Sequence, residues 1–428
     1  MAPDTPETRG TGRAAGTLVV HLDGVLCRTD TQAERRVQAF AARPVASLRG
    51  VPPPVLPASA LPLDTAVLDR VRAARSAGRR TVLATAGDPA QAEALAAELG
   101  LFDEVAADLP FEAPRTTLEA RFGAEVEHVV RGDGTEAAGW RAALKAMRPH
   151  QWSKNALVFL PVLAAHAPGG IGAALAAFVA FSLTASSVYV LNDIADLAAD
   201  RAHPRKRFRP FAAGTLTVGQ GLRLAAGLIL GALVVALLFA PPLFLAVLSG
   251  YYVMTFAYSL WLKRKLVIDV ITLASLYTIR IVAGAAATGI ALSPWMLGFS
   301  MFIFLSLAAV KRQAELTDME RAGVTSLAGR AYMPDDLPVI RAIALSAGYA
   351  AVLVFALYIN SAEVQLLYRQ PDALWLICPL LLYWISRIVM KTHRGLMTDD
   401  PIVYAATDRV SLLTALTGAV IFVAAGVL

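Results

Sequence analysis

The sequence is poor in several residue types and motifs, and each absence narrows its function. Its 428 residues include only two cysteines, Cys27 and Cys378, which lie in different regions, so we expect no disulfide framework. Nothing in it matches a P-loop, a CxxC pair, a G-x-G-x-x-G loop or a Ser-His-Asp arrangement. These absences argue against P-loop nucleotide hydrolysis, thioredoxin-like redox chemistry, dinucleotide binding and serine hydrolase activity.

The N-terminal stretch lacks the apolar core of a signal peptide. Residues 1–16 are polar and rich in Thr, Gly and Arg, and the first apolar run, 17–22, is too short to span a bilayer. We expect 1–16 to be disordered and the domain that follows to stay on the cytoplasmic side.

Apolar residues are abundant but unevenly placed. They make up 56% of the chain, more than in an average soluble protein, and the excess falls after residue 155. Most of the apolar runs there have membrane-spanning length; the first is short, and its start is expected nearer Gln151. The runs are 155–167, 171–191, 221–239, 241–262, 267–290, 293–310, 338–360, 373–390 and 410–428. We therefore expect an all-α multi-pass domain with nine transmembrane helices over 151–428, after an amphipathic linker over 136–150.

Basic residues alternate between the connections of these runs. The segments before 155 and around 201–209, 263–265, 311–330 and 391–409 are basic, whereas the intervening turns contain one basic residue, Arg369. The positive-inside rule then places the N-terminus and every acidic motif in the cytoplasm and the C-terminus outside, in the cytoplasmic (inner) membrane. Topology rather than nucleic-acid binding thus accounts for the net charge of +6.

The region before the membrane domain predicts a soluble α/β fold over 17–135. Buried strands are expected at 17–26, 80–87 and 126–130, and helices at 65–77 and 89–99. Strands that alternate with helices favour a parallel, Rossmannoid sheet with its functional edge at the strand carboxyl ends.

An acidic cluster follows the second apolar run. Asn192, Asp193, Asp196 and Asp200 share one face if the segment is helical, and carboxylates at a helix C-terminus oppose the helix dipole unless a cation compensates. Oxygen ligands at this spacing suit Mg²⁺, and the basic residues over 201–209 can hold phosphate. The segment therefore predicts a site for a diphosphate-bearing substrate. The alternative is a solvated helix end.

Further ionisable residues lie at or within later runs. Asp269 and Arg280 are eleven residues apart, which places them on one helix face about 16 Å apart. Such residues usually line a polar cavity, but a structural ion pair with a neighbouring helix is the alternative. Lys311, Arg312 and Glu315 either pair with one another or serve a site. The Asp-Asp-Pro turn at 399–401 is common and carries little by itself.

Together, the nine runs, the Asn192-Asp193-x-x-Asp196-x-x-x-Asp200 motif and an acidic residue after Tyr258 and Lys263 resemble the UbiA-type intramembrane prenyltransferase superfamily. The resemblance covers residues 141–428. It implies that Asp193, Asp196 and Asp200 bind Mg²⁺, that Asp193, Asp196 and Asp269 are catalytic, and that an isoprenoid lipid is a substrate in the bilayer. The second motif departs from the family pattern because Leu273 stands where a second aspartate is usual.

Two basic stretches narrow the resemblance. Arg148-Pro-His-Gln-Trp152-Ser-Lys154-Asn155 and the run from Asp200 to Pro210 are similar to the branch exemplified by decaprenyl-phosphate phosphoribosyltransferase. That branch implies transfer of 5-phosphoribose from phosphoribosyl pyrophosphate to a polyprenyl phosphate. The substrate-binding residues it implies are Asn192, Lys154, Lys206, Arg207, Arg209, Tyr258, Lys263, Arg280 and Lys311. Prenyl transfer from a prenyl diphosphate to an aromatic or quinone-precursor acceptor is the alternative. A transporter or scaffold is disfavoured because nearly all charges lie at one membrane face.

The N-terminal domain resembles the haloacid-dehalogenase-like phosphatases in His21-Leu-Asp23-Gly24, Thr85 and Gly132-Asp133. His21 stands where that family has its nucleophilic aspartate, and no lysine occurs before Lys145. An imidazole brings no negative charge to a magnesium site. The resemblance therefore implies a degenerate domain without phosphatase activity.

Overall fold

The computed structural model describes residues 16–129, 139–323, 331–397 and 400–427. The chain divides into two compact units, each with its own internal contacts. The first unit joins residues 1–148 to the segment 189–227, and the second joins 149–188 to 228–428. The acidic cluster thus belongs to the same unit as the N-terminal fold.

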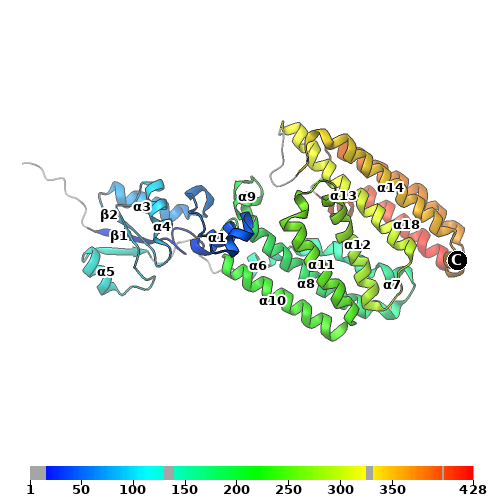
Figure 1. Cartoon of the computed structure of the whole chain (residues 1–428), viewed down its shortest axis with the longest axis horizontal. Coiled ribbons are helices and arrows are strands. Elements are labelled where there is room, and N and C mark those ends of the chain that lie inside the picture. The colour runs from blue at the N-terminus through cyan, green and yellow to red at the C-terminus, as the bar shows by residue number, and fades with distance from the viewer. Residues whose placement is uncertain (1–15, 130–138, 324–330, 398–399, 428) are drawn as a thin grey trace, which may run out of the picture. The chain divides into compact units, whose positions relative to one another are not determined.

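The N-terminal fold of the first unit is a four-stranded parallel sheet in the order β3-β2-β1-β4 (Figure 1). The strands are β1 (Thr17–His21), β2 (Arg80–Ala84), β3 (Glu104–Ala106) and β4 (Val126–Val129). The helices are α1 (Thr31–Ala42), α2 (Pro44–Leu48), α3 (Thr65–Ser76), α4 (Pro89–Leu99) and α5 (Arg115–Phe122), with a 3₁₀ turn, η1 (Ala58–Ala60). The parallel sheet that the sequence predicts is confirmed.

Alternation along the strands explains why both faces of the sheet are covered. Leu18 and Val20 of β1 belong to one apolar core, and Val19 between them belongs to another. A parallel strand buried on both faces has the continuous apolar run seen in the sequence. Helix α3 ends as predicted, since Gly78 just beyond it has φ +76°, a left-handed conformation that glycine adopts without strain.

The rest of the first unit surrounds the acidic cluster. It contains α6 (Trp140–Met147), the end of α8 (Ile171–Ala195), α9 (Leu197–Ala202), η4 (Lys206–Phe208) and the start of α10 (Val218–Phe239). Their apolar side chains form one core, which includes Ile194, Leu197 and Phe211. Gly221 leaves room for this core, because a Cβ there would press into the rings and methyl groups of Phe211 and Ile194.

Across the described residues, eight helical segments are long and apolar enough to cross a membrane. They are Pro168–Ala195, Val218–Phe239, Pro242–Leu260, Ile268–Thr288, Pro294–Ala322, Pro334–Ile359, Pro371–His393 and Arg409–Gly426. In helix terms these are η3 (Pro168–Gly170) with α8, α10, α11 (Pro242–Leu260), α12 (Ile268–Thr288), α13 (Pro294–Ala322), η6 (Pro334–Asp336) with α14 (Leu337–Ile359), η7 (Pro371–Leu376) with α16 (Ile377–His393), and α18 (Arg409–Val427). Shorter helices are η5 (Leu262–Arg264), α15 (Ala362–Leu367) and α17 (Pro401–Thr407).

Helix α12 is central to the second unit. It packs against α11 and α13, and α13 packs along α14 (Figure 1). In α12, 72% of the most apolar window is buried, against 11% in α18 at the periphery. Asp269 and Arg280 on α12 are accordingly buried in protein.

The predicted count of nine spans is not confirmed. The run 155–167 is built from a 3₁₀ segment, η2 (Pro149–Phe159), and a short helix, α7 (Leu160–Ala164). Both pack along α12 in its own direction: Asn155 meets Arg280, Val158 meets Gly284, and Gly170 just beyond meets Thr288. A Cβ at Gly284 would collide with the Val158 carbonyl, so glycine permits this close approach.

Candidate active site

The acidic cluster spans a break between two helices. Asp193 lies in the last turn of α8, Asp196 is the residue between the helices, and Asp200 lies in α9. The amide of Asp196 donates to the carbonyl of Asn192 at 2.9 Å, and that of Asp200 donates to Asp196 at 2.8 Å. Helical spacing thus continues through the break, and the face that the sequence predicts is largely kept.

Two arginines hold the carboxylates. Arg209 Nη1 lies 3.3 Å from Asp193 Oδ1 and 2.7 Å from Asp200 Oδ2, and Arg148 Nη2 contacts the same Asp193 oxygen. The aspartates are almost fully buried, whereas the side chains of Arg209 and Arg148 are 28% and 22% exposed. Arg209 is therefore the positive group between the carboxylates.

The site role of Arg148 was missed by sequence reasoning. It lies in the stretch 148–155 that we compared with the phosphoribosyltransferase branch, but its φ of +52° and its contact with Asp193 had no signal in the sequence.

Two of the three predicted ligands, Asp193 and Asp200, offer oxygens that suit a hard divalent cation. The oxygens of Asp193 and Asp200 converge on one guanidinium nitrogen, and carboxylate oxygens are ligands that Mg²⁺ accepts. Within the described parts of the chain, no three His, Cys, Asp or Glu side chains form a metal-ligand group. The assignment of Asp193, Asp196 and Asp200 to Mg²⁺ remains a prediction, with Asp196 half-buried beside the other two.

The basic residues after the cluster differ in their roles. Lys206 and Arg207 lie in η4 and are exposed, and the Lys145 ammonium donates to the carbonyl of Phe208 at 3.2 Å beside them. Arg209, the third predicted phosphate-binding residue here, donates to the carboxylates of Asp193 and Asp200.

In the second unit, Asp269 is part of a buried ion pair. Its Oδ2 lies 2.5 Å from Nη2 of Arg312 on α13, and its Oδ1 accepts a hydrogen bond of 2.8 Å from Tyr258. Asp269 and Arg312 are both fully buried, and Arg312 also contacts Glu315 and the ring of Tyr332. This is the structural alternative that the sequence left open.

Arg280 is bound by other partners. Its Nε donates to Asn155 at 2.9 Å, its Nη2 donates to the Tyr251 hydroxyl at 3.2 Å, and its Nη1 donates to a carbonyl in its own helix. Its guanidinium also lies over the rings of Phe181, Tyr251 and Tyr277. Arg280 and Asp269 share a helix, but Asp269 forms its ion pair with Arg312.

Lys154 is the other buried cation of the second unit. Its ammonium contacts Asp400, which also caps α17 by accepting from the amides of Ile402 and Val403. Burial alone would raise the pKa of Asp400, but the charges of Lys154 and Lys311 outweigh it and lower that pKa. Lys154, Lys311 and Asp400 thus form one charged group. Lys263, predicted beside Tyr258, is half-buried in η5.

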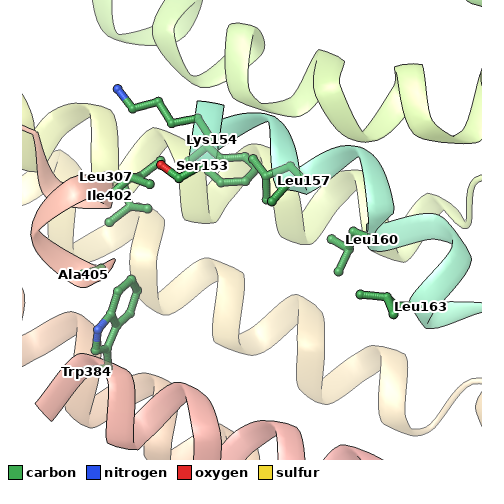
Figure 2. Close-up of a pocket in the computed structure, with 11 residues that line it drawn as sticks. Ser153, Lys154, Leu157, Leu160, Leu163, Leu307, Trp384, Ile402 and Ala405 are labelled. Atoms are coloured by element: carbon green, nitrogen blue, oxygen red, sulfur yellow. The ribbon is translucent and has the colours of Figure 1, made fainter. Parts of the chain in front are cut away.

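A cavity of about 340 Å³ begins at this charged group. Figure 2 shows Lys154 and Ser153 at one end, with Leu157, Leu160 and Leu163 following along η2 and α7. The lining is otherwise apolar and comes from α13, α16 and α17: Phe304, Leu307, Trp384, Ile402 and Ala405. In Figure 2 the Lys154 ammonium points away from these apolar side chains, and it contacts Asp400. An apolar cavity beside such a charged group suits a lipid with an anionic head.

Three of the residues on which the resemblance to phosphatases rests, His21, Asp23 and Thr85, lie among the described residues, and that resemblance remains a prediction. Asp23 Oδ1 accepts from the amide of Thr31 at 2.8 Å, and Thr85 follows the neighbouring strand. Burial, helped by His128, lowers the pKa of His21 to about 4, so His21 is neutral near pH 7. It therefore supplies no charge where the phosphatases have a carboxylate. Asp133 and Gly132 lie outside the described residues.

The helices and the acidic and basic residues at their ends define a multi-pass membrane enzyme. The chain belongs to the UbiA prenyltransferase family, whose model matches residues 156–402. It is thus an integral membrane transferase of that family.

Relatives extend over different parts of the chain. The uncharacterized protein y4nM of Sinorhizobium fredii (strain NBRC 101917 / NGR234) is 34% identical, over 92% of this chain and 88% of its own. Because so little of this chain lies outside that match, the match includes most of the N-terminal fold. The nodulation protein NoeC of Azorhizobium caulinodans is 40% identical over 63% of this chain and 88% of its own. A decaprenyl-phosphate phosphoribosyltransferase of Mycobacterium tuberculosis (strain ATCC 25618 / H37Rv) is 42% identical over 42% of this chain and 62% of its own.

Proposed function

We propose that this transferase moves 5-phosphoribose from phosphoribosyl pyrophosphate to a polyprenyl phosphate, with Mg²⁺, at the cytoplasmic face of the membrane. The observation that carries the proposal is the apolar cavity lined at one end by Ser153 and Lys154, beside the charged group of Lys154, Lys311 and Asp400. A polyprenyl phosphate has the matching form, a long apolar chain with one anionic end.

The number of basic side chains near the two acidic groups favours a reaction with two anionic substrates. Arg148 and Arg209 are partly exposed beside the carboxylates of the first unit, and Lys154 and Lys311 surround one carboxylate in the second. A prenyl diphosphate with an aromatic acceptor needs phosphate contacts for one substrate alone. The resemblance to decaprenyl-phosphate phosphoribosyltransferases, over part of the chain, supports the same choice.

In the proposed reaction, a phosphate oxygen of the lipid bonds to ribose C1 while the bond from C1 to the diphosphate breaks. Asp193, Asp196 and Asp200 would hold Mg²⁺, which neutralises charge on the departing diphosphate. Arg209 and Arg148 leave their carboxylates and bind diphosphate oxygens, which favours departure of that group. Lys154 and Lys311 orient the lipid phosphate.

The proposed topology keeps nine crossings. The 11 residues of η2 and the five of α7 would extend about 30 Å end to end, close to the thickness of the bilayer core. They also run beside α12 in its direction, as a crossing segment would. The basic connections then share the cytoplasmic side and the C-terminus lies outside.

The test is to incubate the purified full-length protein in lipid nanodiscs with labelled phosphoribosyl pyrophosphate, polyprenyl phosphate and Mg²⁺. We expect labelled lipid and release of diphosphate, and loss of both when EDTA removes Mg²⁺. A parallel reaction contains prenyl diphosphate and an aromatic acid such as 4-hydroxybenzoate. Product in that reaction alone would overturn the proposal in favour of prenyl transfer.

A narrower test uses the cavity. Leu160→Trp fills the channel between Leu157 and Leu163, so we expect slower use of a long polyprenyl phosphate and little change with a short one. Val179→Trp, at an exposed position of α8, is the control. Equal loss with both lipid lengths would argue against this cavity as the lipid site.

A further inference from the structure

We propose that the N-terminal α/β fold positions the acidic cluster through an ion pair between Glu34 and Arg201. The proposal rests on the proposed function, in which this cluster binds Mg²⁺ and diphosphate. It assigns Glu34 and Arg201 as positioning residues, which act through Asp200.

The ion pair is bidentate and buried. Arg201 Nη1 and Nη2 each lie 2.7 Å from a different carboxylate oxygen of Glu34. The guanidinium also donates to the carbonyl of Ala60 in η1 and, at 3.1 Å, to that of Ala212. The side chains of Glu34 and Arg201 are only 1% and 8% exposed. A paired fork of this kind fixes the guanidinium in both direction and tilt.

Glu34 is itself held in place by the strand-to-helix loop of the fold. Asp30 caps α1 by accepting from the amide of Ala33, and Asp23 accepts from the amide of Thr31. The Thr29 hydroxyl donates to Glu34 Oε1 at 2.5 Å. The aspartate that resembles a phosphatase motif therefore holds the start of the helix that carries Glu34.

Apolar contacts join the same surfaces. Ala33 and Val37 of α1 pack on the core that contains Leu197 and Phe211. Gly214 has φ +73°, and a Cβ there would lie 3.0 Å from the side chain of Pro62. Helix α1 and the loop at Pro62 thus bear directly on the segment that contains the acidic cluster.

The ion pair fixes the position of Asp200 because Arg201 is the next residue in the chain. Helix α9 has six residues, too few to be stable by itself in water, so its orientation depends on what it packs against. Removal of Glu34 would leave Arg201 buried without its carboxylate, so we expect α9 to shift until that charge reaches water. Asp200 then moves away from Arg209 and Asp193.

The test compares Glu34→Ala with the full-length wild type in nanodiscs. We expect the Mg²⁺ concentration for half-maximal transfer to rise about tenfold, as when a residue that orients a metal ligand is lost. Amide hydrogen exchange over 196–216 should speed up by a similar factor, while exchange in β1 and β2 stays unchanged. Glu93→Ala, at an exposed glutamate of α4, is the matched control and should change neither reading.

Two further variants make the result decisive. Glu34→Gln keeps an oxygen that accepts from Arg201, so it should recover part of the Mg²⁺ affinity. In Glu34→Ala combined with Arg201→Ala, the loss should not exceed that of Arg201→Ala alone. Additive losses, or unchanged exchange over 196–216 in Glu34→Ala, would overturn the proposal. Hydrogen exchange can be measured whether or not the protein is active. A failed transfer assay would therefore count against the proposed function alone, and the role of the ion pair would still be tested by exchange.

Discussion

Asp193 and Asp269 are both buried aspartates paired with arginine, but their arginines differ in access to solvent. Arg209 and Arg148, which hold Asp193, keep a quarter or so of their side chains exposed. Arg312, which holds Asp269, is fully buried and contacts Glu315 and Tyr332 as well. A partly exposed arginine can exchange its carboxylate for a phosphate, whereas a fully buried one cannot do so without unpacking its helix. From this difference we propose that the site of Asp193 is reactive and that the pair of Asp269 with Arg312 is structural.

The largest expected effect is the loss of transfer on removing charge from the first site. Asp193→Asn should lower the rate of transfer by about 10²–10³-fold, because it removes one of the proposed ligands of the charge-stabilising cation. The thermal midpoint should change little, since the asparagine still accepts from Arg148. Asp335→Asn, at an exposed aspartate, is the control. Wild-type transfer by Asp193→Asn would contradict the assignment.

Substitutions in the ion pair of Asp269 with Arg312 should lower the stability of the protein. Arg312→Ala leaves Asp269 buried without its cation, which should cost about 3–5 kcal/mol and reduce the yield of folded protein. Asp269→Asn combined with Arg312→Met removes both charges and should recover most of that loss. Size-exclusion profiles and thermal midpoints in detergent measure both. A well-folded Arg312→Ala variant that has lost only transfer would show that the second site is reactive too.

A smaller effect is expected at the end of the cavity. Lys154→Ala removes one charged contact to the lipid phosphate, so the KM for polyprenyl phosphate should rise about tenfold or more. The KM for phosphoribosyl pyrophosphate should stay within about twofold of the wild type. Lys265→Ala, at an exposed lysine after η5, is the control. Equal change in both KM values would argue that Lys154 does not distinguish the substrates.

The smallest effect is expected at His21. Because its pKa is lowered to about 4, His21 is already neutral near pH 7, and His21→Asn keeps that charge state. Transfer rates should be unchanged, and no phosphatase activity should be present before or after the change. Hydrolysis of p-nitrophenyl phosphate that His21→Asn abolishes would contradict the view that the domain is degenerate.

Hydropathy and basic loops made the membrane spans predictable, because each span must satisfy its backbone within a continuous apolar helix. The run 155–167 departs from that pattern because η2 packs very closely on Gly284 of α12. Its conformation therefore depends on this tertiary contact as well as on its own sequence.

Partners in space were harder to predict than residues in a motif. Asp193 and Asp200 were visible from their spacing, but Arg148 precedes them by more than 40 residues and contacts Asp193 through tertiary packing. Arg312 was seen as a possible partner of Glu315, one turn away, and its contact with Asp269 depends on how α12 meets α13. Helix α1 was not predicted, so the ion pair of Glu34 with Arg201 was out of reach.

The most direct test of the difference between the two sites is metal binding to purified protein. Mn²⁺ can replace Mg²⁺ and be followed by electron paramagnetic resonance in the presence of phosphoribosyl pyrophosphate. Bound Mn²⁺ should be lost in Asp193→Asn combined with Asp200→Asn, and kept in Asp269→Asn combined with Arg312→Met. Retention of Mn²⁺ in the first double variant, or its loss in a folded second one, would contradict the account.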